Sequence, residues 1–137
     1  TPRLSSAASD VYKRQGVYRV MAIISSHTLN GMNGTHAGGF PVRLVNITKN
    51  SEIFSTSIDN NGRLEENVDL SLNDSTDKYE LIFDTGVYWN SLGISASNNQ
   101  IISEVVLRFS MPNKNARYHM PVILSPNSYS TWSSQPE

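Results

Sequence analysis

The apolar stretches of the chain are short, rich in β-branched residues, and separated about every ten residues by clusters of Asn, Gly, Asp and Ser. Short strands divided by turns at this spacing are typical of an all-β sandwich or barrel. Windows of helix length with one apolar face are nearly absent from the same region. The pattern therefore predicts a single all-β domain.

The strand pattern predicts eight β-strands and one short helix. The segment Gly86–Gly93 is bounded by glycines and follows Asp84-Thr85, which favours one or two helical turns capped by Asp or Thr. The turn Asp59–Gly62 contains residues that tolerate positive φ, so we expect the strands on either side of it to pair as a hairpin. The predicted strands are Ala22–Leu29, Phe40–Thr48, Glu52–Ile58, Arg63–Asp69, Lys78–Asp84, Ile102–Ser110, Arg117–Leu124 and a short strand near Tyr129.

The predicted strand Arg117–Leu124 differs from its neighbours because it is apolar on both faces. A two-sheet sandwich of this size covers only one face of each sheet, so the second face of this strand needs another subunit. We therefore expect a homo-oligomer with His119 at its interface. One face carries Tyr118, Met120, Val122 and Leu124, and the other carries His119, Pro121 and Ile123.

Residues 1–20 differ in composition from the rest of the chain. Residues 1–15 are small, polar and basic, and they lack the long apolar core of a signal peptide. The run SSAASDVYKRQ resembles translated sequencing-adapter read-through, with Met21 as the natural start; the alternative is a genuine disordered tail. We exclude 1–20 from the fold and assign the domain to 21–137. Without this segment, 11 basic and 12 acidic residues become 7 and 11, a net charge of −4.

The composition excludes several classes of function. No apolar run approaches the ~20 residues of a membrane helix, and a net charge of −1 without a basic stripe argues against nucleic acid as a partner. The absence of cysteine excludes a disulfide scaffold, a thiolate nucleophile and a cysteine-built zinc site, and it fits a reducing compartment. We therefore expect neither a membrane nor a nucleic-acid protein.

Common catalytic motifs are missing: the chain has no GxGxxG, GxxxxGK[ST], GxSxG or HExxH. The glycine-rich stretch 31–39 lacks the lysine of a phosphate loop and precedes a strand, so we expect a flexible connection. The chain has three histidines, His27, His36 and His119. Histidine is the natural proton shuttle near neutral pH, although a histidine taken alone is more often structural or solvated than catalytic. A zinc site is the weaker reading, because His36 has no spacing relation to the others.

Four motifs occur in order between about Ala22 and Thr131. The motifs are Ser26–Asn30 followed by Gly34 and Ala37, Asn61–Leu64, Tyr79–Trp89, and Arg117–Pro126 with Tyr129–Thr131. Together they resemble the family that unites transthyretins and 5-hydroxyisourate hydrolases. The agreement of ordered motifs over nearly the whole domain is more specific than any one of them.

The resemblance implies a transthyretin-like, eight-stranded two-sheet sandwich. It also implies a homotetramer built as a dimer of dimers, with active sites in the channel where the dimers meet. Hydrolases of this family carry His, Arg and His where the hormone carriers have Lys, Glu and Thr, and this chain has His27, Arg63 and His119 at those places. The resemblance therefore favours a cytoplasmic hydrolase that needs no metal or organic cofactor.

The implied reaction is hydrolysis of 5-hydroxyisourate to 2-oxo-4-hydroxy-4-carboxy-5-ureidoimidazoline in urate degradation. It needs a water aimed at a ring carbonyl, a proton acceptor, and donors for the developing oxyanion. We expect His27 and His119 to share the roles of base and of acid or orienting group, with either as the base. Arg63 is expected to hold substrate oxygens through its planar guanidinium.

The C-terminal tail departs from the family. The hydrolases usually end in Tyr-Arg-Gly-Ser, whereas this chain has Trp132, Ser133, Ser134 and Gln135. We expect Trp132 to form an apolar lid and Ser133 or Ser134 to bond substrate. The alternatives are an altered substrate, lost activity, or a non-enzymatic carrier of a small aromatic ligand in the same channel. His36 stands where the family favours Pro, and we expect it to be only a loop residue.

Overall fold

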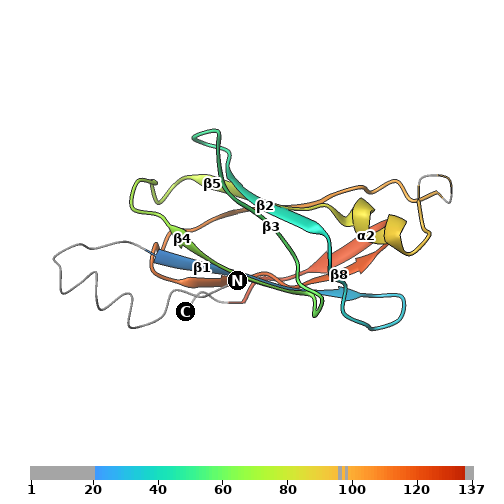
Figure 1. The fold of residues 1–137 in the computed structure, drawn as a ribbon. Helices are drawn as coiled ribbons and strands as arrows, with labels where there is room; N and C mark the ends of the chain where they lie inside the picture. Colours follow the sequence, from blue (N-terminus) through green and yellow to red (C-terminus); the bar gives the residue numbers. More distant parts are fainter. Residues whose placement is uncertain (1–20, 96, 98, 135–137) are drawn as a thin grey trace.

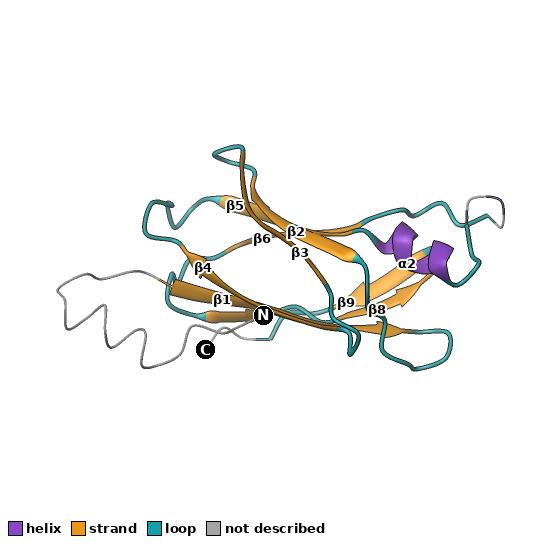
Figure 2. Cartoon of the chain, viewed as in Figure 1, coloured by secondary structure: helices purple, strands orange, loops and turns teal. Residues whose placement is uncertain are grey.

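The computed structural model describes residues 21–95, 97 and 99–134. Within them, two β-sheets face each other as a sandwich, and one short helix lies at one end (Figures 1 and 2). The predicted all-β, two-sheet architecture is confirmed. The expectations for 1–20 and for Gln135 lie outside the described residues. The elements are β1 (Met21–Asn30), β2 (Pro41–Asn46), β3 (Ser51–Ser57), β4 (Arg63–Asp69), β5 (Lys78–Phe83), α2 (Thr85–Ser91), β6 (Val105–Ser110), β7 (Arg117–His119), β8 (Val122–Ser125) and β9 (Ser128–Thr131).

The two sheets have different strand orders. One runs β4-β1-β8-β9, with β7 also paired to β1, and the other runs β3-β2-β5-β6. Strand β1 is antiparallel to β4 and parallel to β7 and β8. Because β1 has partners on both sides, it brings β4 and the C-terminal strands to one surface.

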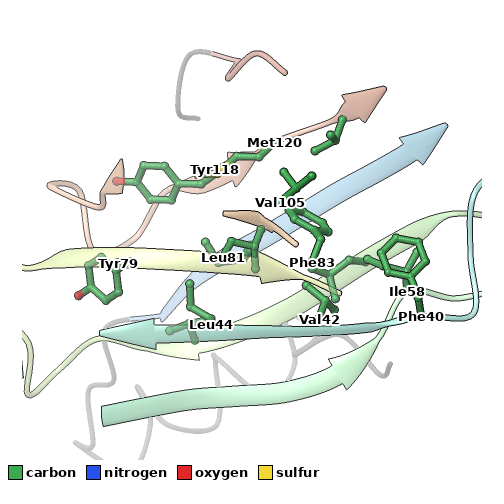
Figure 3. Close-up of a cluster of buried hydrophobic side chains, with 14 of the residues drawn as sticks. Phe40, Val42, Leu44, Ile58, Tyr79, Leu81, Phe83, Val105, Tyr118 and Met120 are labelled. Carbon is green, nitrogen blue, oxygen red and sulfur yellow. The ribbon is translucent and has the colours of Figure 1, made fainter. Parts of the chain in front are cut away.

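The core lies between the sheets (Figure 3). Along β5, the alternate residues Tyr79, Leu81 and Phe83 are each at most 1% exposed, as the alternation of the sequence predicts. Val42 and Leu44 of β2 are equally buried beside them. Full burial of such a side chain contributes about 1.5–3 kcal/mol, so the apolar inner faces hold the sheets together.

The helix α2 closes one end of the sandwich (Figure 1). Its Tyr88 and Trp89 are buried, and the Tyr88 ring centroid lies 5.7 Å from that of Phe40. Asp84 occupies the N-cap position, but its side chain makes no capping hydrogen bond. The predicted helix is therefore confirmed with Asp at its N-cap position, although this residue does not cap it through its side chain. No helix in the described part of the chain is long and apolar enough to cross a membrane.

The prediction that the strands flanking Asp59–Gly62 form a hairpin is wrong. The turn is present, since the Gly62 N–H donates to the Asp59 carbonyl at 3.0 Å. However, β3 pairs with β2 in one sheet while β4 pairs with β1 in the other. Turn residues indicate where the chain reverses, but they do not determine which strands pair with each other. Here the reversal carries the chain from one sheet to the other.

The predicted strand Arg117–Leu124 is divided into β7 and β8 at Met120-Pro121. Pro121 has no N–H to donate to the ladder. The Ser26 hydroxyl instead donates to the Met120 carbonyl at 2.7 Å. Because of this interruption, the described part of the chain has nine strands rather than the eight expected.

Candidate active site

The outer face of the sheet around β1 brings together the three predicted catalytic residues. His27 lies directly opposite Arg63 in the ladder of β1 and β4. On the other side of β1, Ser25 lies opposite His119 of β7. Because Ser25 and His27 are two residues apart on one strand, they and their cross-strand partners share a face. Residues distant in sequence thus form one polar cluster.

The imidazole of His119 is held by Ser25. The Ser25 Oγ atom lies 2.8 Å from Nδ1 of His119, and Ser25 is 4% exposed. Burial lowers the pKa of His119 below its ordinary value, and the nearby cations Arg63 and Arg117 lower it further. His119 is therefore neutral near neutral pH. Because Ser25 contacts Nδ1, the second ring nitrogen, Nε2, is the one that can exchange a proton with a ligand or water.

His27 has an imidazole partner that the sequence did not indicate. Its Nε2 atom lies 3.0 Å from Nδ1 of His36. Burial lowers the pKa of His27, as do Arg63, His36 and His119, while a hydrogen bond with the backbone at Asn61 acts in the opposite direction. His36 is thus more than the loop residue that we expected.

Arg63 is positioned by the turn before β4. Its backbone N–H donates to Oδ1 of Asp59 at 2.9 Å. Gly62, immediately before it, has a φ of 74° and approaches β1 so closely that a Cβ atom would lie 2.4 Å from the Thr28 carbonyl oxygen. The turn therefore sets Arg63 opposite His27.

The ion pair on this face involves a different arginine. Arg117 is bonded to the Glu65 carboxylate, and Glu65 lies opposite Ser25 in the β1–β4 ladder. Among the described residues, the Arg63 guanidinium is exposed and has no carboxylate within ion-pair distance. Arg63 is therefore the cation of this cluster that is available to bind an anionic or oxygen-rich ligand.

The tail residues divide between two places. Trp132 and Ser133 line a cavity of about 390 Å³ beside β6, together with Tyr118 and Met120 of the inner face. Ser134 lies beside the cluster, since its N–H donates to the His119 carbonyl at 3.3 Å. The tail thus passes His119 at Ser134, whereas Trp132 and Ser133 border the cavity that residues of β6 and β9 also line.

Sequence reasoning missed Ser25, His36 and the pair Glu65–Arg117. Most of them lie two residues from a predicted site residue on the same strand. Ser25 precedes His27 by two residues, Glu65 follows Arg63 by two, and Arg117 precedes His119 by two. Residues at this spacing share a strand face. His36 gave no such signal because it reaches the cluster through a loop.

The cluster does not resemble a metal centre. In the part of the chain that the structure describes, no group of three or more His, Cys, Asp or Glu side chains could hold a metal ion. Arg63 adds positive charge beside both histidines, and Arg117 adds it beside His119. The arrangement offers neutral imidazoles and a cation, which suit proton transfer and binding of oxygens.

Fold and site together define a two-sheet β-sandwich protein with a His–Arg–His cluster on the outer face of one sheet. Residues 24–133 match the HIUase/Transthyretin family, and the chain belongs to this family. The resemblance seen in the sequence motifs is confirmed.

Several similar proteins are named hydrolases. The 5-hydroxyisourate hydrolase of Pseudomonas aeruginosa is 28% identical over 82% of this chain and 90% of its own length. The probable 5-hydroxyisourate hydrolase of Schizosaccharomyces pombe is 34% identical over 80% of this chain and 88% of its own. These matches span almost the whole of both relatives.

Solved structures show the same fold at lower identity. The 5-hydroxyisourate hydrolase of Klebsiella pneumoniae superposes with a TM-score of 0.66 at 19% identity, over 83% of this chain and 99% of its own. Transthyretin from Sparus aurata gives 0.66 at 21% identity, over 81% and 95%. An (S)-allantoin synthase gives 0.71 at 23% identity over 93% of this chain, which spans 50% of that protein. The transthyretin-like sandwich is therefore confirmed.

Proposed function

We propose that this protein hydrolyses 5-hydroxyisourate to 2-oxo-4-hydroxy-4-carboxy-5-ureidoimidazoline, a step of urate degradation. The observation that carries the proposal is the placement of His27, Arg63 and His119 on one sheet face. Relatives at 28% and 34% identity over most of the chain are named as hydrolases of this substrate. The carrier alternative has only the shared fold in its favour.

His119 is the base in this proposal. The general base must be neutral before it accepts a proton from water. Burial and two arginines lower the pKa of His119, which keeps the ring neutral. Ser25 engages Nδ1, so Nε2 takes the proton from the attacking water. His27 acts as the acid or orienting group on the other side of the substrate.

Arg63 binds the substrate oxygens and stabilises the oxyanion. Its guanidinium is planar and presents paired donors, a geometry that suits an oxygen-rich flat ring. It is exposed beside His27 and has no carboxylate partner among the described residues. Removal of an oxyanion donor typically costs about 10²–10³ in rate, so Arg63 has a large expected share in catalysis.

The tail completes the site in this proposal. Ser134 already contacts the His119 backbone, which supports a tail that borders the substrate. Ser134 supplies a hydroxyl beside His119, and from the neighbouring cavity Ser133 supplies a second hydroxyl and Trp132 an apolar lid. These residues replace the family's tail arginine with neutral donors, so binding of substrate anions depends more heavily on Arg63.

We also propose a cytoplasmic homotetramer. His119 and Ile123 on the outer face remain only partly buried in the monomer, and β6 and β9 each end a sheet. Val106, Tyr129 and Trp132 are 38%, 43% and 51% exposed along these edges. Such surfaces are suited to subunit contacts, and a chain without cysteine is undisturbed by a reducing compartment. Light scattering should give the mass of four chains; a monomer would contradict the tetramer.

The test uses 5-hydroxyisourate generated from urate by urate oxidase. Purified protein should accelerate the ultraviolet decay of this compound above its spontaneous rate. The variants His27→Ala, Arg63→Glu and His119→Ala should each lose much of the acceleration. If all three variants kept full activity, the proposed roles would be wrong even though the protein was a hydrolase.

A further inference from the structure

His36 reaches the cluster because the chain after β1 folds back on it. The Asn30 N–H donates to the Thr35 carbonyl at 2.8 Å, and the Ala37 N–H donates to the Thr28 carbonyl at 3.0 Å. His36 lies opposite Leu29 in an isolated bridge. Opposed residues share a face, and Leu29 shares its face with His27 two residues earlier. His36 is therefore placed diagonally beside His27.

The loop that carries His36 is anchored to the core at its base. The Thr28 hydroxyl donates to the Ala37 carbonyl. Asn30 is buried, donates from Nδ2 to the Tyr88 hydroxyl at 3.0 Å, and accepts the Met32 N–H at 2.8 Å. These bonds fix the backbone on both sides of the loop, so the position of His36 is set by the fold rather than by its ring contact alone.

The two imidazoles meet in a geometry that suits one shared proton. Nε2 of His27 and Nδ1 of His36 are 3.0 Å apart, and the ring centroids are 5.1 Å apart with an angle of 38° between the planes. A hydrogen bond between two ring nitrogens requires one donor and one acceptor. Full protonation of both rings would set two N–H groups against each other and break the bond.

We propose that His36 is a positioning residue for His27, holding its ring in one orientation and one tautomer through the Nε2···Nδ1 hydrogen bond. Its effect on rate rests on the proposed hydrolase function, whereas the hydrogen bond can be tested without substrate. The role of a histidine in proton transfer depends on its tautomer, which its hydrogen-bond partners fix. At His27 the backbone at Asn61 is one partner and a second imidazole is the other. His36 provides this partner at a position where the family favours proline.

The charges around His27 agree with this arrangement. Arg63 faces it from β4, His119 from β7, and His36 from the loop; the Arg117–Glu65 pair lies next along the same face. Arg63, His36 and His119 all lower the pKa of His27. A proton on His27 would add positive charge beside Arg63, so this arrangement favours the neutral ring that a single shared hydrogen bond requires.

The direct test is ¹⁵N-edited NMR of the imidazoles, because the chain has only three histidines. His36→Phe keeps a ring but removes both nitrogens, and His36→Asn keeps a hydrogen-bonding group near the Nδ1 position. Met32→Gln, at an exposed site in the same loop, is the control. We expect His36→Phe to raise the His27 midpoint by about 0.2–0.7 pH unit, the scale of one exposed charge interaction, and to change its tautomer signals. We expect His36→Asn to keep the tautomer, and Met32→Gln to change neither.

Enzyme kinetics of the same His36 variants provide a second test. With 5-hydroxyisourate, His36→Phe should lower kcat about tenfold, within the ~10²-fold range of a misplaced group, with little change in KM because Arg63 remains. His36→Asn should recover most of the rate. Unchanged His27 signals in both His36 variants would overturn the proposal whatever the activity. Altered signals in a protein without hydrolase activity would keep the positioning contact and reject the proposed function.

Discussion

The Oγ atom of Ser25 lies 2.8 Å from Nδ1 of His119, across the parallel strands β1 and β7. The two residues are 94 positions apart in the chain. Their contact exists because β1 is the central strand of its sheet and receives the C-terminal strands along one edge. The orientation of the proposed base therefore depends on the pairing of the first and last parts of the fold.

Replacement of Ser25 should affect catalysis more than folding. In Ser25→Ala, His119 loses the partner that fixes its tautomer, and we expect kcat/KM to fall about 2- to 10-fold, the value of one hydrogen bond. Ser25→Thr restores the hydroxyl and should recover activity. Steady-state kinetics check this, with Ser55→Ala, an exposed serine of the opposite sheet, as the control. A Ser25→Ala enzyme with wild-type kinetics would show that Ser25 does not position the base.

The stability of the protein should depend on pH through its histidines. Folding lowers the pKa of His27 and His119 from an ordinary value of 6.5. Below that pH the unfolded chain binds protons that the folded protein does not, so the free energy of unfolding falls as the pH falls. Once the pH is below the pKa values of the two histidines in the folded protein, these groups no longer lower the free energy of unfolding.

Urea unfolding between about pH 8 and 5 measures this dependence. The slope should be shallower in His27→Gln and in His119→Gln, because each variant removes one of the two groups. A wild-type protein that was equally stable across this range would contradict the lowered pKa values. An unchanged slope in both variants would assign the dependence to other groups.

Replacement by alanine should destabilise the protein more at Gly62 than at Gly34, although the two glycines have nearly the same backbone angle φ. Gly62 and Gly34 have φ of 74° and 75°, but only at Gly62 would a Cβ atom meet another atom within 4 Å, the Thr28 carbonyl oxygen at 2.4 Å. We expect Gly34→Ala to cost about 1 kcal/mol from the backbone angle alone, and Gly62→Ala more than about 2–3 kcal/mol. Chemical denaturation compares the two directly. Equal losses in the free energy of unfolding would show that the turn at Gly62 is not packed tightly against β1.

The tail should contribute to substrate binding rather than to the chemical step. If Ser133 and Ser134 donate to substrate, the double variant Ser133→Ala/Ser134→Ala should raise KM about 2- to 10-fold, the range for one neutral hydrogen bond, with kcat nearly unchanged. Ser128→Ala, in the exposed strand β9, is the matched control. An unaltered KM would show that neither serine hydroxyl binds the substrate.

The sequence predicted the layers of this fold well, because alternation is a local property. The inward series Tyr79, Leu81 and Phe83 could be read directly from the pattern, and it is buried as expected. The hairpin across Asp59–Gly62 was wrong because strand pairing is decided by distant partners. The single strand Arg117–Leu124 was wrong because one proline interrupts the ladder at Pro121.

The site was predictable only in part. The motifs that carry the family resemblance pointed to His27, Arg63 and His119, and the structure places these residues on one face. Ser25 could have been found from its spacing to His27. The contact of His36 with His27 depends on how a loop folds back over β1, and no periodic signal reports that geometry.

The most direct test of the central claim compares two exposed arginines in the ultraviolet decay of 5-hydroxyisourate. Arg63 lies opposite His27, whereas Arg43 lies in β2 of the other sheet. We predict that the wild-type protein and Arg43→Gln accelerate the decay equally. We predict that the acceleration by Arg63→Gln is smaller by a factor of about 10²–10³. Decay at the spontaneous rate with wild-type protein, or full activity in Arg63→Gln, would contradict the account.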